Sequence, residues 1–188
     1  TLEATQVLCG VTGYHEGPPS KAGVSHADFI ATWSALFAIG ASLRYRLRTG
    51  HGQWIDLAMY QAGVMSMSDY LMDSMVNGHL AERIGNRHFY RAPQGCYRTK
   101  GHDRWIVVSI GSDRQWEALC RIMGNPQLAT DPRFMSLLSR MKNHDELDEI
   151  INLWTNELSA YELMETLQSE GIAAGPVLDG KDIHQDPH

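Results

Sequence analysis

The densest hydrophobic stretch of the chain runs from about residue 26 to residue 47, where apolar side chains recur so closely that they would occupy nearly every face of a helix. A surface helix normally carries a single apolar stripe, so this pattern predicts a helix packed on several sides. Ser25 and Asp28 stand three positions apart at its start, as in a capping box, and Gly50 is placed to end it. We therefore expect a central buried helix.

The pattern changes after this helix. Residues 53–59 alternate little and are rich in Trp, Ile and Leu, which predicts a short strand buried on both faces, parallel to strands outside this sequence. Residues 60–77 predict a second helix that ends at Gly78. Residues 79–92 show neither helical nor strand periodicity, so we expect an irregular, arginine-bearing connector.

The remainder of the chain alternates between strand and helix patterns. A hairpin is predicted from the two β-rich runs that flank Lys100 and Gly101. The other expected elements are helices over 112–123 and 143–158, a further helix with Ser159 and Glu162 as a capping box and Gly171 at its end, and a strand over 172–178.

Composition narrows the class of protein. With 188 residues and 43% apolar residues, the chain can bury an ordinary core in one domain or slightly more. The net charge of -6 gives no basic face for nucleic acid. The longest apolar run, 29–43, is interrupted by polar residues and is shorter than the ~20 residues that span a bilayer, so we expect no membrane segment.

Cysteine and histidine usage also bears on the class. Cys9, Cys96 and Cys120 are odd in number and far apart, which argues against a disulfide framework and favours a reducing, cytoplasmic setting. The histidines form no pair at metal-ligand spacing, so no metal site is predicted. Neither a phosphate-binding glycine loop nor a serine nucleophile motif is present.

Asp28 is the carboxylate with the most unusual surroundings, since it stands among apolar residues at the start of the predicted helix. One interpretation is a first-turn acid favoured by the helix dipole, which typically contributes about 0.3 to 1 kcal/mol. The other is a nucleophilic or basic carboxylate held ionised by the helix terminus. The residues alone leave both open.

Several motifs resemble the class III CoA-transferases, the CaiB/BaiF family, in that family's order. They are GPPSKAGVSHADF, RTGHGQWIDLAMY, GNRHFYRAPQGCYRT with WIVVSIGSDRQWEAL, ATDPRF, and GIAAGPVLD with DPH. The resemblance covers essentially the whole sequence but only the middle of the family's chain, so we expect a fragment of a longer protein. It implies an interlocked homodimer whose subunits combine a Rossmann-like large domain with a small α/β domain.

The resemblance also implies a division of this chain. Residues 1–78 would be part of the large domain, 79–92 a linker, 93–178 the small domain, and 179–188 the start of the segment that returns to the large domain. The family's catalytic aspartate lies in the block SHADF, which maps onto Asp28. There it would accept the acyl group of acyl-CoA as a mixed anhydride and then carry CoA as an aspartyl thioester.

Other binding positions follow from the same resemblance. Met59 corresponds to a position that lines the CoA cleft. Arg91 and Gly95 are the first and last residues of RAPQG, the block where formyl-CoA transferases carry a glycine run over the active site. Here only Gly95 is glycine, which disfavours formyl and oxalyl substrates. The implied partners are acyl-CoA and a free carboxylic acid as substrates, with no permanently bound cofactor.

Two alternatives stay open at this point. The related α-methylacyl-CoA racemases use an aspartate in the same block as a base, together with a histidine from earlier in the chain. The chain could also be a catalytically incomplete fragment that acts only as a dimerising module, because a helix apolar on all faces needs partners to cover it.

Overall fold

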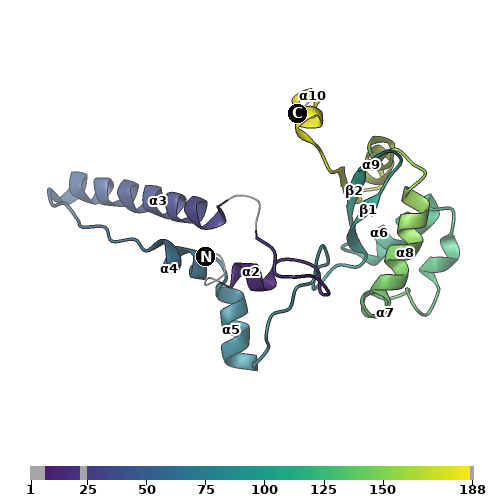
Figure 1. Cartoon of the computed structure of the whole chain (residues 1–188), viewed down its shortest axis with the longest axis horizontal. Helices are drawn as coiled ribbons and strands as arrows, with labels where there is room; N and C mark the ends of the chain where they lie inside the picture. Colours follow the sequence, from purple (N-terminus) through teal and green to yellow (C-terminus); the bar gives the residue numbers. More distant parts are fainter. Residues whose placement is uncertain (1–6, 22–24, 187–188) are drawn as a thin grey trace. The chain divides into compact units, whose positions relative to one another are not determined.

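The computed structural model describes residues 7–21 and 25–186, and the chain divides into two compact units, Thr1–Gly85 and Asn86–His188 (Figure 1). Parts of the motifs GPPSKAGVSHADF and DPH fall on residues 22–24 and 187–188, which lie outside the described residues. The boundary between the two units falls within the predicted connector, 79–92. Each unit is described below by itself.

The first unit is helical in its described residues. Its helices are α2 (Leu8–Val11), α3 (His26–Thr49), α4 (Met59–Met65) and α5 (Ser68–Asn77). The long predicted helix is confirmed as α3, and it ends as expected at Gly50, whose φ is 79° and whose N–H donates to the Arg46 carbonyl at 2.8 Å. The capping box was wrong: Ser25 is the N-cap residue, but its side chain makes no capping hydrogen bond.

Two further predictions for this unit were wrong. Residues 53–58 pair with no strand among the described residues, and Trp54 is 92% exposed rather than buried. A strand needs a neighbour to receive its backbone hydrogen bonds, and the described part of this unit offers none. The predicted helix 60–77 is interrupted at Ser66, whose hydroxyl donates to the Gly63 carbonyl at 2.6 Å, so α4 and α5 are separate.

Helix α3 is far less buried than its composition predicts. Only Ala27 and Ala31 are buried, whereas Trp33 is 70% and Phe37 80% exposed. The chain reverses after α3 and runs back beside it, and α4 packs against it (Figure 1). Within the described residues this is too little to cover the apolar faces. None of the described helices combines the length and apolar character needed to span a bilayer.

The second unit contains a three-stranded antiparallel sheet in the order β1-β2-β3. The strands are β1 (Gln94–Arg98), β2 (Trp105–Ser109) and β3 (Ala173–Pro176). The predicted hairpin is confirmed as β1 and β2, in which Cys96 pairs with Val107. The predicted last strand forms in a shorter range as β3. The mixed fold confirms the α/β class.

Helices cover one face of this sheet. The helices of this layer are α6 (Asp113–Ile122), the 3-10 helix η1 (Pro126–Ala129), α7 (Leu137–Lys142), α8 (His144–Thr155) and α9 (Ala160–Ser169), while α10 (Gly180–Gln185) follows β3 and buries no residue. Helices α6, α8 and α9 confirm predicted elements. Ser112 caps α6 by accepting from the Gln115 N–H at 3.3 Å, whereas Ser159 precedes α9 without a side-chain bond, so that capping box was wrong.

The core of the second unit lies between the sheet and these helices. Helix α8 packs against β1, and α9 packs against β2 and β3. On the strands Tyr97, Ile106 and Val108 are buried while the alternating Val107 is 43% exposed, so one sheet face builds the core. Trp116 and Phe134 meet edge to face in this core, with ring centroids 6.4 Å apart.

Candidate functional site

Asp28 lies in the first turn of α3 and is exposed to solvent. Its backbone N–H donates to the Ser25 carbonyl at 3.1 Å. Within residues 7–21 and 25–186, no ion pair or hydrogen bond engages its carboxylate. Asp28 is thus a solvent-accessible carboxylate at the N-terminal end of a long helix.

Met59 begins α4, in the same unit as Asp28, and is partly buried. Because α4 packs against α3, the helices that carry the two residues are neighbours. The other two candidate residues, Arg91 and Gly95, belong to the second unit. The structure therefore brings the elements of Asp28 and Met59 together and, separately, places Arg91 and Gly95 around one strand start.

Arg91 precedes β1 and is exposed. Its Nη1 donates to the Ser109 hydroxyl at 3.3 Å, and that hydroxyl donates to the Gln94 side-chain carbonyl at 2.8 Å. No carboxylate pairs with Arg91 in the described part of the chain. Its remaining guanidinium donors can therefore bind a carboxylate or phosphate oxygen, the geometry for which arginine is best suited.

Gly95 is buried within β1 and faces the core. A Cβ added at this position would lie 2.8 Å from the ring of Tyr97. This glycine therefore allows Tyr97 to pack closely against the strand. Any contact of Gly95 with a ligand would involve its backbone, because the space on its side-chain face is already filled.

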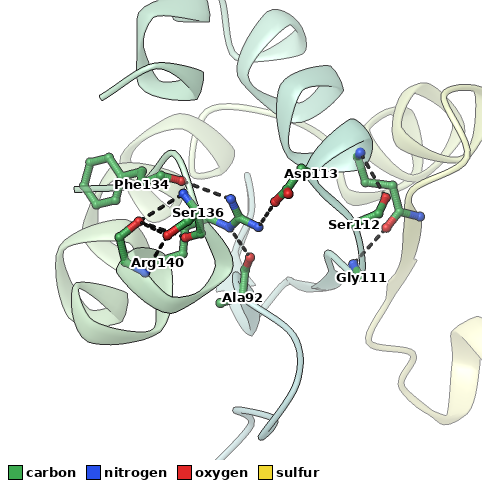
Figure 2. A network of polar contacts seen from close by, with 9 residues as sticks. Ala92, Gly111, Ser112, Asp113, Phe134, Ser136 and Arg140 are labelled. Carbon is green, nitrogen blue, oxygen red and sulfur yellow. Dashed lines mark hydrogen bonds and ion pairs between the residues drawn. The ribbon is translucent and has the colours of Figure 1, made fainter. Parts of the chain in front are cut away.

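Side chains that the sequence analysis did not single out hold the backbone between Arg91 and Gly95. Arg140 donates from Nε to the Ala92 carbonyl at 2.8 Å, and the Gln94 N–H donates to Nε2 of His144 at 3.3 Å (Figure 2 shows the Arg140 network). Both residues are almost fully buried, with Arg140 1% exposed. No sequence motif marks them, since both lie in short helices whose packing depends on distant residues.

His144 lies beside a charged cluster. Arg87 donates to Asp145 and, at 2.9 Å, to Asp148, and the Tyr97 hydroxyl donates to Asp148 at 2.9 Å. Burial lowers the pKa of His144, and its Nε2 must be unprotonated to accept the Gln94 N–H. Burial likewise raises the pKa of Tyr97 well above its ordinary value. Both side chains are therefore uncharged near neutral pH.

Two of the cysteines, Cys96 and Cys120, lie in the second unit and are at least partly buried. Burial raises the pKa of Cys96, and it raises that of Cys120 to about 12, so both remain thiols at neutral pH. Among the described residues no group of three or more His, Cys, Asp or Glu side chains is arranged to hold a metal ion.

Comparison with protein families decides the class. The model of CoA-transferase family III matches residues 1–188, the whole chain. The chain belongs to CoA-transferase family III. This confirms the family resemblance that the motifs indicated.

Relatives within CoA-transferase family III carry specific names. The chain is 34% identical over 187 residues to succinyl-CoA–D-citramalate CoA-transferase of Chloroflexus aurantiacus, covering 99% of this chain and 46% of the relative. It is 33% identical over 179 residues to acetyl-CoA:oxalate CoA-transferase of Acetobacter aceti, covering 95% and 46%. Succinate–glutarate CoA-transferase of Agrobacterium fabrum is 29% identical over 177 residues, with 94% and 44% covered.

Solved structures are also similar to this chain. A CaiB/BaiF family protein from Brucella suis superposes with a TM-score of 0.88 at 28% identity, covering 99% of this chain and 49% of that one. The protein Rv3272 from M. tuberculosis gives a TM-score of 0.80 at 25% identity, covering 99% and 48%. The chain therefore spans about half the length of the family III relatives and structures that it matches.

Proposed function

We propose that this chain supplies the nucleophile of an enzyme that transfers CoA from an acyl-CoA donor to a free carboxylic acid, and that the nucleophile is Asp28. The observation that carries the proposal is an exposed carboxylate in the first turn of α3, within the family block SHADF. The family match across the whole chain supports the reaction class.

The proposed reaction has two halves. The Asp28 carboxylate attacks the thioester carbonyl of acyl-CoA, which forms a mixed anhydride and releases CoA thiolate. The thiolate then attacks the aspartyl carbonyl, which forms an aspartyl-CoA thioester and releases the donor's acid. The acceptor carboxylate repeats these steps in reverse and leaves with CoA, which restores Asp28.

Covalent catalysis by a carboxylate divides one difficult exchange into steps between activated acyl groups. The positive end of the helix dipole can stabilise the oxyanions that form on the aspartyl carbonyl. Asp28 is the third residue of α3, so the reacting carbonyl would lie at this end of the helix.

Three further residues complete the proposal. Met59 would line the CoA cleft, Arg91 would bind a carboxylate or phosphate oxygen of the substrate, and Gly95 would contribute backbone contacts. In this proposal residues 1–78 belong to the large domain and 93–178 to the small domain, with 79–92 as linker and 179–188 as the start of the return segment. The active protein would be an interlocked cytoplasmic homodimer without a permanently bound cofactor.

The acceptor is proposed to be a dicarboxylic acid. The names of three relatives include D-citramalate, oxalate and glutarate, each of which has two carboxyl groups. In such a substrate one carboxylate reacts while the other remains available to bind a cationic side chain. The names of these relatives also support transfer over the racemase alternative, in which Asp28 would act only as a base.

The test is a CoA-transfer assay on the full-length gene product, with succinyl-CoA or acetyl-CoA as donor and glutarate or D-citramalate as acceptor. Oxalate, which the missing glycine run disfavours, is assayed for comparison. Asp28→Asn is expected to lower kcat at least about a thousandfold, since the amide is not a nucleophile. Asp69→Asn is the matched control, because Asp69 is also an exposed first-turn acid, on α5. Transfer retained by Asp28→Asn, or lost equally in both variants, would contradict the assignment.

A further inference from the structure

Each of the three consecutive residues 92–94 has a backbone group that is hydrogen-bonded to another part of the second unit. Arg140 Nε donates to the Ala92 carbonyl at 2.8 Å, the Ile110 N–H donates to the Pro93 carbonyl at 2.9 Å, and the Gln94 N–H donates to His144 Nε2 at 3.3 Å. The side chain of Gln94 is held as well, between Ser109 and the Asn86 carbonyl. These contacts anchor the segment to β2, α7 and α8.

Arg140 is itself held on several sides, as Figure 2 shows. Its Nη1 donates to the Phe134 carbonyl at 3.0 Å and its Nη2 to Asp113 Oδ1 at 2.7 Å. Its guanidinium carbon lies 5.4 Å from the ring centroid of Trp116. A planar guanidinium with its donors engaged on three elements cannot follow a moving loop without breaking buried hydrogen bonds.

We propose that Arg140 is a positioning residue that holds Arg91–Gly95 as a preformed wall of the acyl-CoA site rather than as a mobile cover. The proposal rests on the proposed function, which assigns Arg91 and Gly95 to substrate binding. Ala92 is fully buried, so the segment cannot lift away without exposing it and leaving both its carbonyl and the Nε–H of Arg140 unpaired.

Fixing Ala92 also restrains the neighbouring residue, Arg91. Because Ala92 is fixed and Arg91 is also bonded to Ser109, its guanidinium keeps one direction before substrate arrives. A binding group that is already oriented loses less conformational freedom when ligand binds. Loosening Ala92 is therefore expected to weaken substrate binding and alignment even though Arg140 itself is buried and does not touch substrate.

The kinetic test compares Arg140→Lys with Ile151→Ala in the full-length gene product. Lysine keeps the charge but cannot engage Ala92, Phe134 and Asp113 together, whereas Ile151 is a buried core residue of α8 that makes no contact with the segment through a polar group. Arg140→Lys is expected to lower kcat/KM per folded molecule roughly tenfold to a hundredfold, with a raised KM for acyl-CoA. Ile151→Ala should lower only the folded fraction.

Equal kcat/KM in Arg140→Lys and wild type, or the same change in both variants, would overturn the proposal. Hydrogen exchange followed by NMR gives a readout that does not depend on activity. In the wild type the Gln94 amide should exchange as slowly as the amides of β2. Its exchange should be at least about tenfold faster in Arg140→Lys than in Ile151→Ala.

A Gln94 amide that exchanges in the wild type as fast as exposed loop amides would show a mobile segment and refute the positioning role, even if Arg140→Lys does not fold. If the wild type transfers no CoA while the Gln94 amide is protected, the proposed function fails and the fixed segment stands. The two failures are thus distinguishable.

Discussion

The buried histidine of the second unit should make stability depend on pH. His144 is 4% exposed, it accepts the Gln94 N–H at Nε2, and it is the first residue of α8. Burial lowers its pKa, and the positive end of the helix dipole adds to this, while Asp148, 3.7 Å from Nε2, opposes it. Arg87 also faces this site and disfavours the imidazolium form.

Whether stability rises or falls with pH depends on which state, folded or unfolded, binds a proton at His144. In the unfolded chain His144 titrates near its ordinary pKa of about 6.5, whereas in the folded protein it stays neutral to lower pH. As pH falls below about 6.5 the unfolded state gains a proton that the native state does not, and stability is lost at up to about 1.4 kcal/mol per pH unit. The loss can reach at most about 2 kcal/mol by pH 5.

Urea unfolding between pH 8 and pH 5 measures this dependence, and His144→Gln isolates it. Glutamine places an acceptor near the position of Nε2, so it can keep the bond from Gln94, and it does not titrate. The difference between wild type and variant should therefore grow in favour of the variant as pH falls through 6.5. Parallel pH profiles for the two proteins would refute a neutral, buried His144.

Two matched pairs test the packing of the second unit. Ser112→Ala should lower the free energy of unfolding by about 1 kcal/mol because the Ser112 side chain caps α6. Ser159→Ala should lower it by only a few tenths of a kcal/mol because the Ser159 side chain makes no capping hydrogen bond. Equal losses in urea unfolding would contradict this. Phe134→Ala should cost about 3–5 kcal/mol because it empties a buried site beside Trp116. Phe89 is 50% exposed, so Phe89→Ala should change the free energy of unfolding by no more than about 0.5 kcal/mol. If calorimetry showed the same loss of stability for Phe89→Ala as for Phe134→Ala, the packing of Phe134 in the core would be contradicted.

Local signals in the sequence predicted the elements of the second unit well. The hairpin and helices α6, α8 and α9 follow from alternation, apolar spacing and glycine stops, and each packs against neighbours inside the same unit. The first unit shows the limit of this approach. The stretch around Trp54 has the composition of a buried strand, yet it has no strand to pair with among the described residues.

Local sequence signals predicted the helix that carries Asp28, but they did not predict the side chains that make long-range contacts in the second unit. The helical position of Asp28 follows from the apolar run after it, but the role proposed for it rests on the family motif and not on periodicity. Arg140 and His144 were missed because their importance depends on contacts with Ala92 and Gln94, nearly fifty residues away. Sequence spacing within a short helix does not carry that information. The two incorrect capping boxes show that residue type alone does not establish a side-chain bond.

The central claim is that Asp28 carries CoA covalently. The full-length gene product should be incubated with acyl-CoA, treated with hydroxylamine, digested and analysed by mass spectrometry. We predict a hydroxamate on Asp28 that requires acyl-CoA and is absent from Asp28→Asn. An unmodified Asp28 during active turnover, with solvent deuterium entering the α-carbon of the substrate, would contradict the account and indicate racemisation.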